Sequence, residues 1–176
     1  MKLSKTLITL LLMLHSCGVF ANERVALIIG NENYKVSPLK TAVNDASAFA
    51  NTLSQIGFQV NLKTNASQPE MEAAVQAFGK SIQAGAIGLF YYAGHAVQHD
   101  GENYLVPINA ISSITAPEHL RYKTVPLGYV LGVVNQSASD LNVVILDSCR
   151  NSPFKSFSRD LTRGITRMPS SEGTLI

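Results

Sequence analysis

Two reactive side chains follow apolar runs that have the length and composition of buried strands. Residues 86–92 (AIGLFYY) come shortly before His95, and residues 142–146 (NVVIL) come shortly before Cys149. In an open parallel sheet, functional groups gather outside the carboxyl ends of the strands, so both residues are expected two or three positions past a strand at one rim. They are 54 positions apart with one predicted helix between them, so the strands can be neighbours. A thiol and an imidazole that meet there form a nucleophile and its base.

Each of the two residues has a plainer explanation when it is taken alone. A cysteine after a strand is commonly a small buried side chain, and a single histidine is commonly a surface or core residue. The equivalent placement of both favours a Cys–His dyad, because His99 and His119 lie in polar segments that lack it. Once the N-terminal segment is removed, Cys149 is the sole cysteine; it is then a free thiol, an intermolecular link or a nucleophile.

The N-terminal segment has the pattern of a secretory signal peptide. Two lysines precede the apolar run of residues 6–14, and a small-residue cleavage pattern ends at Ala21. We therefore expect a signal peptide over residues 1–21, a single domain over residues 22–176, and export to the periplasm or the medium. The apolar run is too short to span a bilayer, so no membrane span is expected.

Lipidation is the alternative fate of this segment. Cys17, in the sequence LHSC, would then be the acylated residue of a lipoprotein signal, although His15 makes that box a poor one. Removal of the two N-terminal lysines leaves 12 basic and 12 acidic residues. A balanced charge of this kind gives no support for nucleic-acid binding, which needs a clustered basic surface.

Strand-like and helix-like segments alternate along the rest of the chain. This alternation predicts parallel βαβ units and a three-layer α/β/α sandwich with a mostly parallel sheet. The expected strands are residues 25–29, 58–62, 86–92 and 142–146, with a short extended piece at 103–108, and the expected helices are 41–56, 69–83 and 126–139. Residues 173–176 read as the start of a further strand. We expect the final strands of the domain to lie beyond it, leaving a sheet edge open to a partner or to self-association.

Four segments carry motifs that together are specific. They are RVALIIGNENY at 24–34, LKTAVNDA at 39–46, FYYAGHAVQHDGENYLVPINA at 90–110 and VVILDSCRNSPF at 143–154. These segments resemble the caspase-like cysteine peptidases. The Asp-Ser-Cys sequence at 147–149 resembles the metacaspases and related bacterial proteins more than the true caspases.

The resemblance implies a role for each site residue. Cys149 would attack a peptide carbonyl as a thiolate, and His95 would support the thiolate and protonate the departing amine. The backbone N–H groups of Cys149 and Ala96 would hold the oxyanion. No third catalytic member is required, and no Asp or Asn partner for His95 is evident. Some metacaspases require calcium, but the sequence assigns no ligand set and no metal cluster.

The same resemblance places two acids in the pocket for the residue before the scissile bond. They are Asp45, in the sequence VND, and Asp147, two residues before the cysteine. Two carboxylates suit a guanidinium or an ammonium, so the expected substrate is a peptide with Arg or Lys before the cleaved bond. Alternatively, Asp45 caps a helix and Asp147 pairs with Arg150 or with a neighbouring N–H.

A basic tail follows the cysteine. Its four cationic residues recur every fourth position: Lys155, Arg159, Arg163 and Arg167. A solvated loop or helix face explains this spacing plainly. Alternatively, an Arg/Lys-specific peptidase could cut its own loop at these residues.

Two other classes of function remain to be weighed. A catalytically weak, caspase-like binding or regulatory module would share the fold and differ only in turnover. Nucleotide binding is disfavoured, because the strand that ends at Gly30 is not followed by a G-x-G-x-x-G pattern.

Overall fold

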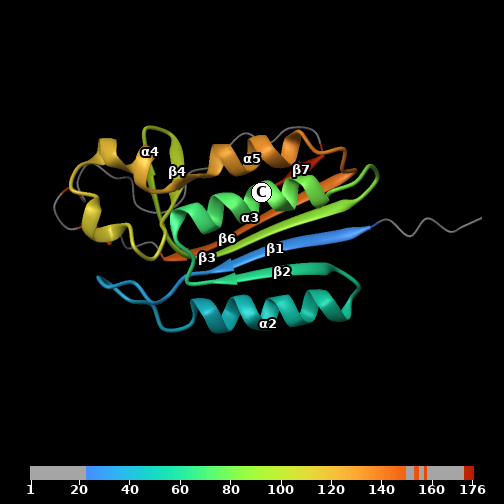
Figure 1. Cartoon of the computed structure of the whole chain (residues 1–176), viewed down its shortest axis with the longest axis horizontal. Helices are drawn as coiled ribbons and strands as arrows, with labels where there is room; N and C mark the ends of the chain where they lie inside the picture. Colours follow the sequence, from blue (N-terminus) through green and yellow to red (C-terminus); the bar gives the residue numbers. More distant parts are fainter. Residues whose placement is uncertain (1–22, 150–152, 155–156, 158–172) are drawn as a thin grey trace, which may run out of the picture.

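A twisted, mostly parallel sheet forms the centre of this computed structural model, which describes residues 23–149, 153–154, 157 and 173–176 (Figure 1). Five strands lie in the order β2-β1-β3-β6-β7 with parallel neighbours. The distal part of β3 pairs instead with β4, and β4 with β5, both antiparallel. The strands are β1 (Arg24–Gly30), β2 (Gln59–Thr64), β3 (Ile87–His99), β4 (Glu102–Leu105), β5 (Val125–Pro126), β6 (Leu141–Cys149) and β7 (Thr174–Leu175).

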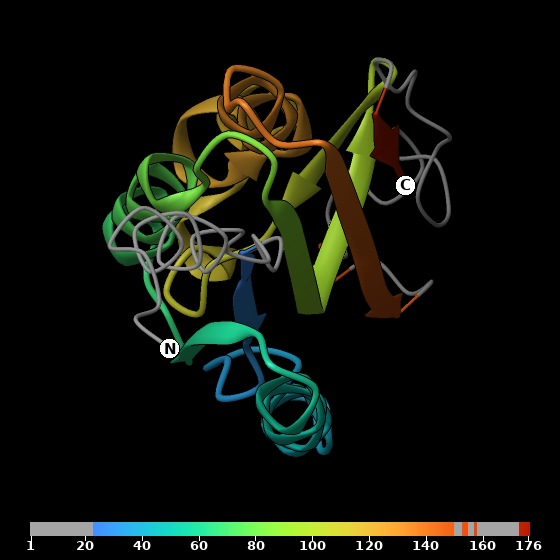
Figure 2. The ribbon, with the colours of Figure 1, turned by 90° about the vertical axis from the view of Figure 1, so that its right-hand side faces the viewer.

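Helices cover both faces of the sheet. Helix α2 (Ala42–Gln55) lies on one face, while α3 (Gln68–Ser81) and α5 (Leu127–Asn135) lie on the other (Figure 2). Successive residues of β3 alternate between the two cores: Tyr91 packs with α2 and Tyr92 with α3 and α5. The predicted three-layer sandwich is therefore confirmed.

Local sequence explains where the elements begin and how closely they pack. Helix α3 starts with a capping box, in which Ser67 donates its backbone N–H to Glu70 Oε2 at 2.8 Å. At Gly30, an added Cβ would lie 2.6 Å from the Cβ of Ala46, so this glycine allows α2 to approach β1 closely. Close packing is the structural reason for the glycine at the end of this strand.

Two strands extend further than expected. The apolar run predicted β3 to end at residue 92, whereas it continues to His99. Likewise β6 ends at Cys149 rather than at residue 146. Both continue because the residues beyond the apolar runs still pair with neighbouring strands. His95 and Cys149 thus lie within strands, not past them, and this corrects the expected placement.

A smaller unit begins at the antiparallel hairpin of β3 and β4 and continues into short helical elements. The sequence patterns predicted only its extended piece. The predicted extended piece at 103–108 is β4, which forms a hairpin with β3. Residues 111–123 then form three short helical elements with a core of their own, which includes Ile111, Leu120 and Phe154. These elements are η1 (Ile111–Ser113), η2 (Pro117–His119) and α4 (Leu120–Lys123).

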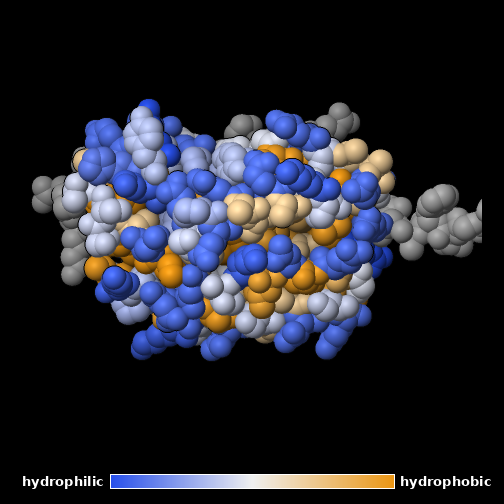
Figure 3. All heavy atoms as spheres, viewed as in Figure 1, coloured by the Kyte–Doolittle hydropathy of each residue, from blue (hydrophilic) through white to orange (hydrophobic). Residues whose placement is uncertain are grey.

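The surface over α2, β2 and α3 mixes polar and apolar residues (Figure 3). Apolar side chains reach it along β2, where Leu62 is exposed. No helix within the described ranges is long and apolar enough to cross a membrane. The predicted start of a strand near residue 173 is confirmed as β7, which pairs with β6.

Candidate active site

His95 and Cys149 lie opposite each other on neighbouring strands. They form the final pair of the parallel β3–β6 ladder. Neighbouring strands are about 4.8 Å apart, so the register places the backbones of the two residues side by side. The predicted proximity of the two residues is therefore present at the level of the backbone.

The imidazole of His95 is oriented by a main-chain oxygen. Its Nε2 lies 2.7 Å from the carbonyl oxygen of Ser37. Because a carbonyl only accepts, Nε2 carries the proton, and in the neutral ring Nδ1 is the acceptor. The buried Nδ1 has no hydrogen-bond partner among the described residues. The unpaired nitrogen is thus the one available to take a proton.

Burial keeps this histidine neutral. Only 4% of the His95 surface is exposed, and burial lowers its pKa below the ordinary value of 6.5. The hydrogen bond to Ser37 opposes this shift but does not reverse it. A neutral imidazole at neutral pH is the form that can act as a general base.

Two buried tyrosines hold the main chain of His95. The hydroxyl of Tyr34 accepts the His95 N–H at 3.1 Å, and the hydroxyl of Tyr92 donates to the His95 carbonyl at 2.8 Å. The Tyr34 ring also packs against the imidazole with a centroid distance of 4.6 Å. Gly94 makes room for both hydroxyls, since a Cβ there would lie 2.5 Å from the oxygen of Tyr92.

The loop that carries Ser37 is tied down at both ends. Ser37 adopts a left-handed conformation with φ of 56°. Glu32 accepts the N–H of Leu39 through its carbonyl and the N–H of Val43 through its carboxylate. The side chain of Asn65 accepts the N–H of Glu32 at 3.1 Å. These bonds fix the carbonyl on which the imidazole depends.

The two residues of the predicted oxyanion hole lie at the end of the parallel ladder. The His95 carbonyl accepts from Val106, and Ala96 is the next residue in the antiparallel ladder. Because alternate residues of such a ladder point to opposite sides, the N–H of Ala96 points away from β4. The Ala96 side chain packs in the core under α3 and α5. Its methyl group therefore lies on the face of the sheet that α3 and α5 cover, and not on the face that α2 covers.

Asp45 and Asp147 line one small cavity. The cavity has a volume of about 120 Å³, and both carboxylate residues are exposed. Asp45 lies in the first turn of α2, whose N-cap residue is Thr41, so the alternative in which Asp45 caps the helix is wrong. Asp147 accepts a hydrogen bond from the Tyr91 hydroxyl at 3.1 Å. The alternative partner Arg150 lies outside the described residues.

One cation shares this cavity with the two acids. Lys40 lines it, yet among the described residues it forms no ion pair with either carboxylate within 4.0 Å. Neither Lys40 nor Tyr91 was identified by sequence reasoning. Tyr91 lies in a quoted motif, but its apolar surroundings suggested only a core residue.

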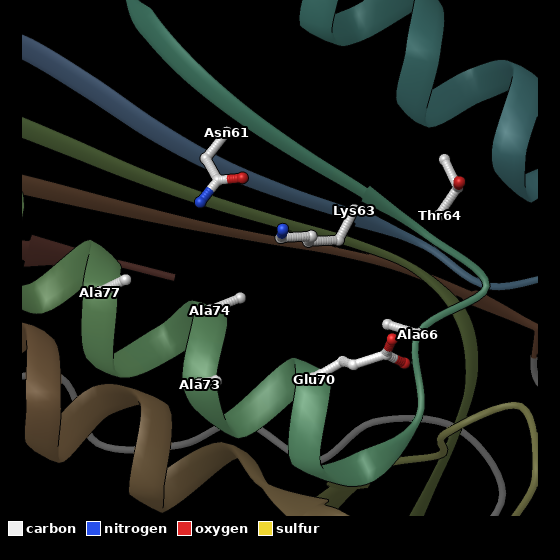
Figure 4. Close-up of a pocket in the computed structure, with 8 residues that line it drawn as sticks. All are labelled: Asn61, Lys63, Thr64, Ala66, Glu70, Ala73, Ala74 and Ala77. Atoms are coloured by element: carbon white, nitrogen blue, oxygen red, sulfur yellow. The ribbon is translucent and has the colours of Figure 1, made fainter.

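A larger hollow lies elsewhere, between β2 and α3 (Figure 4). Its volume is about 280 Å³, and it contains none of the predicted site residues. Alanines form half of its lining, with Lys63 and Glu70 near its rim. Size alone therefore does not identify the functional site.

Several predicted features fall on parts of the chain that are not described. The signal segment, with Cys17, and all four cationic residues of the tail lie outside the described residues: Lys155, Arg159, Arg163 and Arg167. Within the described ranges, no group of three or more His, Cys, Asp or Glu side chains could hold a metal ion.

Comparisons with known proteins agree on the fold and on the family. A family model described as the caspase domain matches residues 23–174. The human mucosa-associated lymphoid tissue lymphoma translocation protein 1 is 34% identical over 131 residues, and its mouse homologue is 33% identical. The match covers 74% of this chain but only 15% of either relative.

A solved structure shows the same fold at low sequence identity. The crystal structure of protein GSU0716 from Geobacter sulfurreducens superimposes with a TM-score of 0.58 at 15% identity. It covers 74% of this chain, which spans 52% of that protein. A likeness at this identity supports the fold alone.

Proposed function

Because the chain belongs to the caspase-domain family, we propose that it is an exported cysteine endopeptidase that uses a Cys149–His95 dyad and cleaves after Arg or Lys. The observation that carries the proposal is the pairing of His95 with Cys149 in adjacent strands. The imidazole is buried and offers its unpaired Nδ1, and an acidic cavity lies beside it on the same strands.

The proposed reaction begins with transfer of the thiol proton from Cys149 to Nδ1 of His95. The thiolate attacks the substrate carbonyl carbon, and the carbonyl oxygen becomes an oxyanion held by the N–H groups of Ala96 and Cys149. His95 then gives the proton to the leaving amine as the C–N bond breaks, which leaves a thioester on Cys149. Water, deprotonated by His95, attacks the thioester. The C–S bond breaks, the peptide acid leaves, and His95 returns the proton to the Cys149 thiolate.

The carbonyl of Ser37 performs the orienting task that a carboxylate performs in a Ser-His-Asp triad. It holds Nε2–H at 2.7 Å and so maintains the tautomer in which Nδ1 accepts. A carbonyl is neutral, so it stabilises the imidazolium less than a carboxylate would. A thiol needs less assistance than a hydroxyl, because its pKa is much lower.

Substrate choice follows from the charge of the cavity. Asp45 and Asp147 are both exposed carboxylate residues, and Lys40 supplies a single opposing charge. The net charge of these three groups is −1, which one substrate cation would neutralise. A peptide with Asp before the scissile bond would meet two like charges.

The test uses fluorogenic peptides that end in Arg, Lys or Asp, with Cys149→Ala as the catalytic control. We expect turnover after Arg and Lys, none after Asp, and none in the variant. Asp45→Asn should raise KM for the Arg peptide by roughly 10-fold or more, as expected when a charge-assisted contact is lost. An intact, folded protein without turnover, with or without calcium, would instead favour the binding or regulatory module.

Three further parts of the proposal concern the chain beyond the site. Export would follow from cleavage after Ala21, which the N-terminal sequence of the secreted protein would reveal. Self-cleavage at Arg159 or Arg163 would appear as a Cys149-dependent change of intact mass. Self-association through the outer edge of β7 would appear as a concentration-dependent dimer in sedimentation.

A further inference from the structure

We propose that the hydroxyl of Tyr91 sets a preference for arginine over lysine in the Asp45–Asp147 cavity, by holding the Asp147 carboxylate in one orientation. This inference rests on the proposed function and names the substrate cation more narrowly. Tyr91 is a positioning residue here, because it acts through Asp147.

Tyr91 is held between the sheet and α2. Its ring is buried and packs against Phe49 with a centroid distance of 4.8 Å and an interplanar angle of 47°. Phe49 and Asp45 are four residues apart on α2, so they share one face of the helix. The hydroxyl reaches along β3 to Asp147 Oδ2 at 3.1 Å. Packing thus fixes the position of the ring, while the hydroxyl bonds to Asp147, which lines the cavity.

The hydroxyl is a permanent donor. Burial raises the pKa of Tyr91, and the carboxylates of Asp147 and Asp45 raise it further, because a phenolate there would face two negative charges. The phenol therefore keeps its proton at every pH at which the protein would work. Its hydrogen bond restrains rotation of the Asp147 carboxylate and occupies one side of Oδ2.

The restraint has different consequences for the two substrate cations. With Oδ2 engaged by the hydroxyl, Oδ1 of Asp147 remains as an acceptor, and Asp45 lines the same cavity from α2. A guanidinium presents N–H groups in a rigid fork, so it gains when two acceptors are held in fixed directions. An ammonium is a compact charge with rotating donors, and its attraction depends little on how the carboxylate is turned. The fixed carboxylate therefore favours arginine.

The experiment compares Tyr91→Phe with wild type on two peptides that differ only in Arg or Lys before the scissile bond. Phenylalanine keeps the ring contact with Phe49 and removes only the oxygen. We expect the ratio of kcat/KM for Arg over Lys to fall by about 3- to 10-fold, since water replaces part of the lost hydrogen bond at an exposed carboxylate. The change should appear in KM for the Arg peptide, with kcat within about 2-fold of wild type. Tyr122→Phe removes the same oxygen from an exposed side chain of α4 and should leave the Arg/Lys ratio of kcat/KM unchanged.

A double-mutant cycle separates this role from a structural one. In an Asp147→Asn background, removal of the Tyr91 hydroxyl should no longer change the Arg/Lys ratio, because the carboxylate that it orients is gone. An unchanged ratio in folded Tyr91→Phe, or equal preference for Arg and Lys in wild type, would overturn the inference. A persistent effect in the Asp147→Asn background would also overturn it.

A binding measurement distinguishes failure of this inference from failure of the peptidase proposal. Product peptides that end in Arg or Lys are titrated calorimetrically into Cys149→Ala, with and without Tyr91→Phe. If wild type shows no turnover, the peptidase proposal fails, while the Arg/Lys affinity ratio still tests the cavity. A ratio that Tyr91→Phe leaves unchanged refutes the role of the hydroxyl in either case.

Discussion

Gly94→Ala adds one methyl group at the point where the main chain of the site is most crowded. An ideal Cβ at this position would lie 2.5 Å from the hydroxyl oxygen of Tyr92 and 2.9 Å from that of Tyr34. Both rings are buried. The tyrosines must therefore move, and their hydroxyls hold the N–H and the carbonyl of the neighbouring His95.

The expected cost can be worked from these contacts. Overpacking of a buried site costs about 1–3 kcal/mol, and each hydrogen bond that is lost adds about 0.5–1.5 kcal/mol. Replacement of a strand glycine returns up to about 1 kcal/mol, because alanine loses less backbone entropy on folding. We therefore expect Gly94→Ala to lower the free energy of unfolding by about 2–4 kcal/mol. Most small domains would remain folded at 25 °C after such a loss.

Urea denaturation measures this change, and Gly132→Ala is the matched control. Gly132 lies in α5 with nothing within 4 Å of an added Cβ, so alanine there should stabilise by up to about 1 kcal/mol through helix propensity. Gly94→Ala should also reduce kcat/KM of the folded protein, because displaced tyrosines shift the main chain of His95. A free energy of unfolding within about 0.5 kcal/mol of wild type would refute the crowding argument, because substitutions at uncrowded surface positions change it by no more than that.

Two further predictions concern charge. The pKa of His95 is lowered in the folded state, so the unfolded state binds more protons below pH 6.5, and stability should fall as the pH drops from 6.5 toward the folded pKa. Thermal unfolding of His95→Gln across this range should lack that part of the pH dependence; an identical pH dependence in the variant would contradict the assignment. Lys40→Gln should lower KM for Arg peptides by about 1.5- to 5-fold, which is the range of an exposed charge interaction, and a rise in KM would show that Lys40 assists binding instead.

Much of the architecture followed from local patterns in the sequence. Apolar runs marked three of the expected strands and an alternating segment marked β2, and the helix-length segments between the strands implied parallel pairing. The neighbouring placement of β3 and β6 followed from the single crossover between them, and it set His95 opposite Cys149. The two acids were paired through the family resemblance, and the structure brings both to one cavity.

The parts that escaped prediction depend on main-chain atoms and on distant partners. The group that orients His95 is the carbonyl of Ser37. Every residue has such a main-chain oxygen, so no pattern of side chains predicts this contact. Ser37 also adopts a positive φ, which is uncommon for a residue other than glycine. Tyr91 looked like a core residue because its ring is one, and only its hydroxyl reaches a carboxylate. Short elements such as η1 and α4 lack the length that periodicity requires.

The error in the end of β3 has a physical cause that bears on the site. On one side, β3 changes partner near His95: the Ala93 carbonyl accepts from Asn31 beyond β1, and the His95 carbonyl accepts from Val106 beyond β4. On the other side, the described part of β6 ends opposite His95. Backbone groups of alternate residues point to opposite sides, so the N–H of Ala96 points to the side on which the β6 ladder ends. A continuous strand thus supplies both the imidazole and the N–H of Ala96 at the end of the β6 ladder. Such an arrangement requires the strand to continue past its apolar run, so the end of the run did not mark the end of the strand.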